Sequence, residues 1–211
     1  MMKIASPLAV LALAALAGSA WAQETTVKFG LTRYDTHSKT SGVTGVGIPA
    51  GADATTGDAN TVVLTGEREV LPNLGVELVL GVPPKIKTEA SGSVAFLGEV
   101  LESRNFSPVL FANYHFGEPG ATWRPYIGLG VNYTKFTHIK SNYGWDVSLS
   151  DSWGWAAQVG VDWKLDKNWG LFASYAALKV KTDMVATGAT VIQTSIDLRP
   201  RAFTVGVSYR F

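Results

Sequence analysis

Hydrophobic and polar positions alternate along several segments of about ten residues. In the clearest, residues 123–136, the apolar positions Pro125, Ile127, Leu129 and Val131 alternate with polar or small residues. The same phase recurs in residues 153–165 and again in residues 202–211. A period of two over such lengths, with turn residues between the segments, predicts β-strands with one apolar face.

Eight segments fit this pattern, an even number, as in single-chain bacterial outer-membrane barrels. They are residues 25–34, 61–70, 75–82, 106–116, 123–136, 153–165, 169–182 and 202–211. After Gln23 no apolar stretch is long enough to span a bilayer as a helix, so a spanning chain must close its strands on themselves. We therefore predict an all-β, eight-stranded antiparallel transmembrane β-barrel.

The connections alternate between short turns and long loops, which places the short turns on the periplasmic side. The short ones are residues 71–74, 117–122 and 166–168, and the long ones are 35–60, 83–105, 138–152 and 183–194. Outward aromatic residues gather at the strand ends, as at membrane interfaces. A soluble β-sandwich would also alternate, but it has no reason to sort its rings by strand end.

The first 22 residues have the three parts of a secretory signal peptide. Lys3 is the positive start, residues 4–17 are apolar, and residues 20–22 (AWA) form the cleavage site. We expect residues 1–22 to be removed near Ala22, leaving a barrel domain of residues 23–211 in the bacterial outer membrane. The whole chain has 18 basic and 17 acidic residues, so loss of Lys3 leaves a mature chain with a net charge of zero. Nothing in this balance indicates a nucleic-acid-binding surface.

The inward phase of the strands divides the lumen by height. The periplasmic end should form a charged floor of Lys28, Glu67, Glu69, Glu77, Arg124, Asp162, Lys164 and Arg210. The outer half should form a hydrophobic lumen of Val63, Val79, Val109, Phe111, Phe136, Leu178, Val180, Ile196 and Leu198. So narrow a barrel holds side chains or one small ligand. We expect the charges to pair into a plug, and the apolar residues either to fill space or to form a chamber for an apolar molecule.

A solute entering from outside would leave most favourably sideways, into the lipid. Pro83, Pro84 and Pro108 lie at the outer ends of neighbouring predicted strands, and proline supplies no ladder donor. They could mark a gap in the wall, or they could only terminate strands. Lys179 and Lys181 could meet phosphates of outer-membrane lipid or lipopolysaccharide, or be simply solvated.

Catalytic and cofactor signals are missing from the sequence. The chain has no cysteine, and His37, His115 and His138 have no metal-ligand spacing. No nucleotide-binding glycine motif precedes a helix. We predict no enzyme, no cofactor and no metal site.

Several short stretches, in order along the chain, resemble the OmpW family of small outer-membrane proteins. They are residues 73–78 (NLGVEL), 123–128 (WRPYIG), 130–134 (GVNYT), 151–154 (DSWG), 158–162 (QVGVD) and 208–211 (SYRF). The resemblance implies an eight-stranded barrel with a hydrophobic channel that passes small hydrophobic molecules. An alternative implied by the same family is a structural or stress-related barrel that displays loops as a colicin or phage receptor.

The resemblance also implies roles for single residues. Phe211 looks like the terminal aromatic assembly signal that the barrel-assembly machinery reads. The family's channel is narrowed by a Leu and a Trp, and the matching positions here are the smaller Val79 and Ala176. Closure by other residues, such as Phe111 or Phe172, is then expected.

Overall fold

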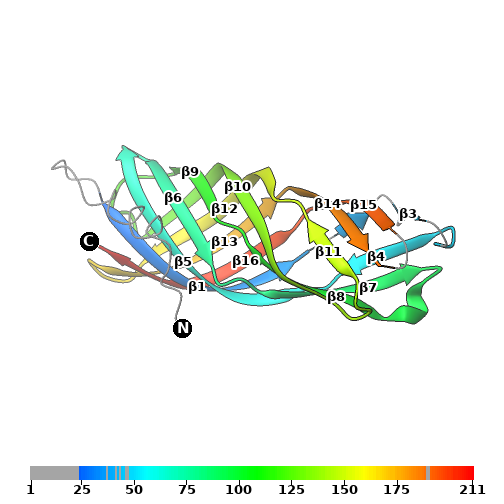
Figure 1. Cartoon of the computed structure of the whole chain (residues 1–211). Helices are drawn as coiled ribbons and strands as arrows, with labels where there is room; N and C mark the ends of the chain where they lie inside the picture. Colours follow the sequence, from blue (N-terminus) through cyan, green and yellow to red (C-terminus); the bar gives the residue numbers. More distant parts are fainter. Residues whose placement is uncertain (1–23, 37, 41, 43, 46–47, 189–190) are drawn as a thin grey trace, which may run out of the picture.

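Eight long strands close into a barrel in which each strand is antiparallel to both neighbours (Figure 1). The computed structural model describes residues 24–36, 38–40, 42, 44–45, 48–188 and 191–211. The barrel strands are β1 (Thr25–Asp35), β5 (Ala59–Leu71), β6 (Leu74–Gly81), β9 (Val109–His115), β10 (Trp123–Ser141), β12 (Ser152–Lys164), β13 (Trp169–Leu178) and β16 (Arg201–Arg210). The predicted eight-stranded barrel is confirmed. The expected signal peptide, residues 1–22, lies outside the described residues.

Further strands extend the barrel beyond the end opposite the carboxyl terminus (Figure 1). They are β2 (Ser38–Thr40), β3 (Thr44–Gly45), β4 (Ala52–Thr56), β7 (Lys85–Gly92), β8 (Glu99–Phe106), β11 (Asp146–Leu149), β14 (Val180–Thr187) and β15 (Val191–Leu198), with the 3-10 helix η2 (Ala95–Leu97). Strands β8, β7 and β4 continue from the outer part of β10, and β11, β14, β15 and β2 form a second sheet. We call these strands the extension. No helix in the described ranges is long and apolar enough to cross a membrane.

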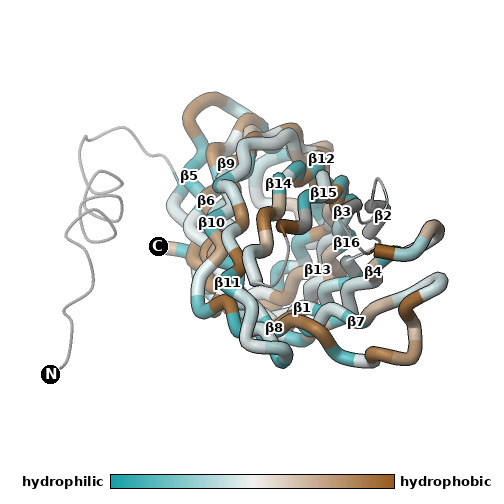
Figure 2. The backbone as a smooth tube through the Cα atoms, turned by 45° about the vertical axis from the view of Figure 1, so that its right-hand side comes forward, coloured by the Kyte–Doolittle hydropathy of each residue, from teal (hydrophilic) through white to brown (hydrophobic). Residues whose placement is uncertain are grey.

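The prediction of long loops is therefore wrong for most of these residues. In β7 the side chains of Ile86, Thr88 and Ala90 are buried and those between them are exposed. Strands of two to eight residues give a weaker alternation than the barrel strands, and their inward residues include threonine and alanine as often as large apolar side chains. The extension lies at the end of the barrel away from the carboxyl terminus, and Figure 2 shows it turned toward the viewer, with its strands continuing from those of the barrel.

The predicted strand 106–116 is broken at Pro108. Strand β8 ends at Phe106 and β9 begins at Val109, because proline has no N–H for the ladder. The β6–β9 ladder consequently ends at the pair Val79 and Val109, and the next rung above it joins Lys85 of β7 to Arg104 of β8. We call the stretch between these rungs, residues 80–84 opposite 105–108, the seam.

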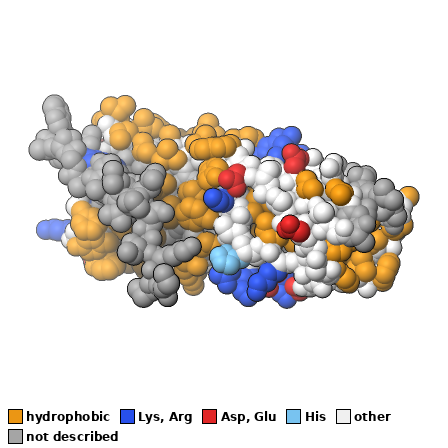
Figure 3. All heavy atoms as spheres, in the orientation of Figure 1, with side chains coloured by type: hydrophobic (Ala, Val, Ile, Leu, Met, Phe, Trp, Pro, Cys, Tyr) orange, Lys and Arg blue, Asp and Glu red, His pale blue; other side chains and the backbone are white. Residues whose placement is uncertain are grey.

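The outer wall of the barrel is apolar, and Figure 3 shows its hydrophobic side chains covering one half of the molecule. Leu129 is 73% exposed and Leu31 is 62% exposed, which suits acyl chains and not water. Aromatic pairs mark both ends of this wall. Trp123 stacks on Trp163 and Trp169 meets Tyr209 at the periplasmic end, whereas Tyr133 lies against Trp153 at the outer end.

The tight turn between β12 and β13 is held by one carboxylate. The backbone N–H groups of Trp169 and Asn168 donate to Asp166 Oδ1 at 2.7 and 2.8 Å. These donors stabilise the ionised form and lower the pKa of Asp166. This short connection lies at the same end of the barrel as the start of β1 and the carboxyl terminus.

Gly154 of β12 allows a close approach of neighbouring backbone. A Cβ atom there would collide with the carbonyl oxygen of Lys179, which cannot move aside as a flexible side chain could. Gly154→Ala should therefore destabilise the barrel by about 1–3 kcal/mol, seen as a lower urea midpoint in detergent micelles. Gly81→Ala is the control, because its Cβ would meet Val63 Cγ1 at an ordinary 3.7 Å. Equal losses in the two variants would contradict this explanation.

Candidate functional site

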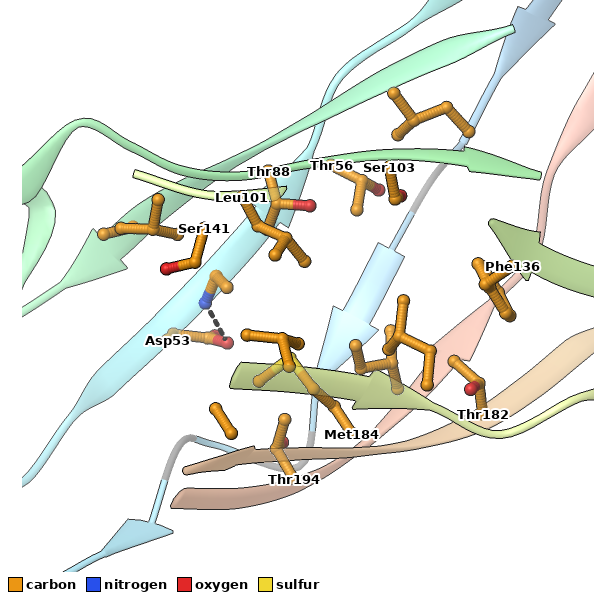
Figure 4. Close-up of a pocket in the computed structure, with 18 of the residues that line it drawn as sticks. Asp53, Thr56, Thr88, Leu101, Ser103, Phe136, Ser141, Thr182, Met184 and Thr194 are labelled. Carbon is orange, nitrogen blue, oxygen red and sulfur yellow. Dashed lines mark hydrogen bonds between the residues drawn. The ribbon is translucent and has the colours of Figure 1, made fainter. Parts of the chain in front are cut away.

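The extension encloses a cavity of about 320 Å³, which we call the outer cavity. Strands β4, β7, β8, β10, β11, β14 and β15 all contribute to its wall. The large apolar side chains in the wall include Ile86, Leu101, Phe136, Leu149, Met184 and Ile196. Figure 4 shows Leu101, Phe136 and Met184 on different strands around one space, with the hydroxyls of Thr56, Thr88, Ser103, Thr182 and Thr194 between them.

The outer cavity is almost free of charge. Among the described residues that line it, Asp53 is the one ionisable acid or base apart from tyrosine, and Asp53 Oδ1 accepts the N–H of Ala54 at 2.8 Å. One oxygen of this carboxylate therefore already accepts a hydrogen bond from the next residue's backbone, which Figure 4 marks with a dashed line. An apolar wall with scattered hydroxyls suits a neutral molecule, because burial of an unpaired charge there is costly.

A second, smaller cavity of about 100 Å³ lies inside the barrel, and we call it the inner cavity. Tyr34 and Asn105 line both cavities and so stand at their junction. The Oδ1 atom of Asn105 is buried and has no hydrogen-bond donor within the described residues. This atom is an acceptor available to a ligand hydroxyl at the narrow point between the cavities.

The inner cavity is bounded below by Glu77 and Gln158 and opens against the seam. Its wall includes the seam residues Gly81, Val82, Pro84 and Ser107, in addition to its apolar core. Val82 is 58% exposed on the outside of the barrel and still contributes to the cavity wall. At the seam, therefore, few atoms separate the lumen from the lipid side.

Lys28 lies at the centre of the floor and is fully buried. Its Nζ atom is 3.0 Å from Glu67 Oε2, 3.0 Å from Asp162 Oδ1 and 3.8 Å from Glu77 Oε1. The same ammonium lies 4.8 Å from the ring centroid of Tyr126. One cation thus holds carboxylates from three other strands, which closes the lumen below the inner cavity.

Neutral polar side chains complete this cluster. Asn113 donates to Glu67 at 3.1 Å and to Glu77 at 2.8 Å, and Gln158 also donates to Glu77. His115 Nε2 lies 2.6 Å from Glu67 Oε1. The sequence predicted a floor of charged residues only, and not Asn113, Gln158 and Tyr126, although these share the inward phase of their strands.

The remaining predicted floor residues lie apart from Lys28. Arg124 pairs with Glu69, and Arg210 lies 3.3 Å from Glu24, a residue that sequence analysis did not select. Lys164 is half-buried and makes no ion pair with any described residue. The charges therefore form a central cluster and separate rim pairs instead of one continuous layer.

Phe211 lies at the rim of the barrel and is 74% exposed. Its ring meets Tyr209 at 4.9 Å, and its backbone N–H donates to the carbonyl of Thr25 at 2.9 Å. The terminal residue is thus fixed to the first strand, with its side chain open to a partner.

Glu67, His115 and Asp162 bring possible metal-ligand atoms within 4.8 Å of one another. The sequence predicted no metal site, because Glu67, His115 and Asp162 have no recognisable ligand spacing: successive residues are 48 and 47 positions apart. The Lys28 ammonium already forms ion pairs with two of these groups, the carboxylates of Glu67 and Asp162. We therefore assign these side chains to the plug.

The predicted lumen residues divide between the two cavities. The inner cavity is lined by Val63, Val79, Val109, Phe111, Phe172, Ala176 and Leu178. The outer cavity is lined by Phe136, Ile196 and Leu198. Val180 is buried but lines neither cavity. Most of the outer wall, including Ile86, Leu101 and Met184, comes from segments taken for loops in the sequence.

Comparisons with known proteins agree on one relationship. The profile of the OmpW family matches residues 22–211. Outer membrane protein W of Escherichia coli is 33% identical over 205 residues, covering 93% of each chain. The dibenzothiophene metabolism operon protein DoxH of a Pseudomonas species is 27% identical over 203 residues, also covering 93% of each chain. The crystal structure of the outer membrane protein OprG from Pseudomonas aeruginosa superposes with a TM-score of 0.83 at 25% identity, covering 90% of this chain and 96% of that one.

Proposed function

The chain belongs to the OmpW family of bacterial outer-membrane proteins, and on that premise we propose that it passes small, neutral, hydrophobic molecules across the outer membrane. The observation that carries this proposal is the order of the two cavities and the charged floor along the barrel. An outer cavity with a single lining carboxylate among the described residues leads through the junction at Tyr34 and Asn105 to an inner cavity, which ends on an ion-paired floor. A passage of this kind accepts apolar molecules and holds back ions.

The floor makes a straight route to the periplasm costly. A solute would have to separate Lys28 from Glu67 and Asp162, and breaking a buried ion pair costs several kcal/mol. An apolar solute gains nothing from those charges in return. The seam offers the alternative, because there the ladder between β6 and β9 has ended and the cavity wall is a single layer of side chains. We infer that the solute leaves sideways into the acyl chains.

The residues that line the outer cavity, together with one relative, indicate the class of solute. Neutral hydroxyls and apolar side chains line the outer cavity, so the favoured solutes are hydrocarbons, aromatic compounds and their simple alcohols. DoxH is named for an operon of dibenzothiophene metabolism, and dibenzothiophene is a neutral aromatic compound. The same class suits the cavity described here.

A panel of solutes tests the function directly. Cells or vesicles with and without the protein are given an alkane, a fused-ring aromatic compound and a sugar, and uptake is measured. We expect faster uptake of the first two solutes only. No difference with either hydrophobic solute would contradict transport and favour the alternative, a barrel that displays its outer surface as a receptor.

The exit route has its own test at the seam. Val82→Glu would place a charge where the inner cavity meets the lipid, and uptake of an alkane should fall by about tenfold or more, since a charge in hydrocarbon costs over 2 kcal/mol. Val131→Glu is the matched control, because Val131 is 53% exposed on the same lipid-facing surface and lines neither cavity. If Val82→Glu transports as well as the control, the solute does not leave through the seam.

A further inference from the structure

The outward face of β7, β8 and β10, just above the seam, carries its charges in ordered rows. From the membrane outward, the rows are Phe106 with Lys135, then Lys85, Arg104 and Thr137, then Lys87, Glu102 and Lys140, and last Glu89 with Glu99. Cations therefore occupy the two rows nearest the membrane, and carboxylates occur only in the rows farther out. We call Lys85, Arg104 and Lys135 the cationic lip.

The three cations of the lip are close enough to share one anion. Lys85 and Arg104 are directly opposite on β7 and β8, and Lys135 is the diagonal neighbour of Arg104 on β10. Such pairs have Cβ atoms about 5 Å apart when opposite and roughly 7 Å apart when diagonal. Like charges directly opposite destabilise a sheet unless an anion lies between them.

The protein itself supplies too few carboxylates to balance the lip. Lys85 Nζ is 3.4 Å from Glu102 Oε1. Glu99 already pairs with Lys87, whose Nζ lies 2.8 Å from Glu99 Oε2. Within the part of the chain that the structure describes, Arg104 and Lys135 make no ion pair. A half-buried guanidinium without a carboxylate is well suited to a phosphate, which it can bind with two parallel hydrogen bonds.

The height of the lip matches a lipid phosphate. Phe106, beside Lys135, is 39% exposed, and below it Leu110 and Val131 are exposed on the apolar wall, at 47% and 53%. Figure 3 shows basic side chains gathered where the hydrophobic half of the surface ends. The boundary between acyl chains and headgroups lies at this level, and lysine or arginine there is attracted to anionic lipid.

We propose that the cationic lip binds a phosphate of lipopolysaccharide in the outer leaflet. The Lys85–Arg104 rung is also the upper edge of the seam, so the acyl chains of the bound molecule would lie across the outlet of the inner cavity. A solute leaving the seam would then enter those acyl chains first. This binding site depends on the placement of the barrel in the outer membrane and not on the transport proposed above.

Native mass spectrometry of the full barrel in detergent, titrated with bisphosphorylated lipid A, tests the proposal. The test variant carries Lys85→Gln, Arg104→Gln and Lys135→Gln. The matched control carries Arg68→Gln, Lys164→Gln and Lys167→Gln, which removes the same charge at the end of the barrel farthest from the extension. We expect the lip variant to bind lipid A at least about tenfold more weakly than the wild type, and the control to bind like the wild type.

Three further ligands separate a lipopolysaccharide site from other anion sites: dephosphorylated lipid A, phosphatidylglycerol and inorganic phosphate. Each should bind markedly more weakly than bisphosphorylated lipid A. Equal binding of any of them, or equal loss in the lip and control variants, would overturn the proposal. Heat-induced mobility shifts on gels show that each variant is folded, and alkane uptake into vesicles without lipopolysaccharide reports on transport separately.

Discussion

Lys28→Met should destabilise the barrel by about 3–5 kcal/mol, the usual cost of removing one partner from a buried ion pair. Three carboxylates, on Glu67, Glu77 and Asp162, would lose their shared cation while remaining enclosed. The methionine side chain keeps most of the volume, so the loss reports on charge and not on packing. Urea unfolding in detergent micelles, followed by tryptophan fluorescence, measures it.

Two further variants make this prediction specific. Lys164→Met is the control, because Lys164 is half-buried at the same end of the barrel and makes no ion pair with described residues, and it should change stability by less than about 1 kcal/mol. Adding Glu67→Gln to Lys28→Met should recover part of the loss, since one uncompensated charge is removed. If Lys28→Met is as stable as the Lys164 variant, the floor is not held by this cluster.

Ala176→Trp should slow the uptake of a bulky alkane by about tenfold or more, because the indole narrows the path and an added barrier of about 1.4 kcal/mol is a factor of ten in rate. Ala176 packs beside Val79 against the buried group of Val109, Phe111 and Leu178. An indole at this position would occupy much of an inner cavity of only about 100 Å³. Uptake into vesicles containing the purified barrel is the measurement.

The neighbouring residue supplies the control for this experiment. Ala177 follows Ala176 on β13 and, by the alternation of a strand, points to the lipid side. Ala177→Trp adds the same indole outside the lumen and should leave uptake unchanged. Unchanged uptake in both variants would show that the solute does not pass Ala176.

The barrel and the identity of its inward residues were predictable because strand alternation has a period of two. Once residues 123–136 and 153–165 were assigned as strands, Arg124 and Asp162 were necessarily on the inner side. The partners of each residue were not predictable. His115 meets Glu67 across 48 positions, and that depends on the register of strands that do not follow one another in the sequence.

The extension escaped prediction for a different reason. Strand β4 has five residues and β11 has four, too few for alternation to stand out from chance. Their inward residues are also small or hydroxylated, as with Ala52 and Thr56, and such residues are frequent in loops too. The large outer cavity is built from these segments, so sequence analysis located the inner cavity and missed most of the outer one.

Strand β10 runs from Trp123, at the barrel end that carries the carboxyl terminus, to Ser141 in the extension, with a register shift between Thr137 and Lys140. At about 3.3 Å per residue its 19 residues measure about 60 Å, whereas the hydrocarbon layer is about 30 Å thick. Even at a tilt of about 40°, one end of this strand must stand well above the lipid. For the passage proposed above, an apolar molecule that enters at that end is enclosed by protein at the level of the headgroups, and it reaches the hydrocarbon without crossing the headgroup layer as a free solute.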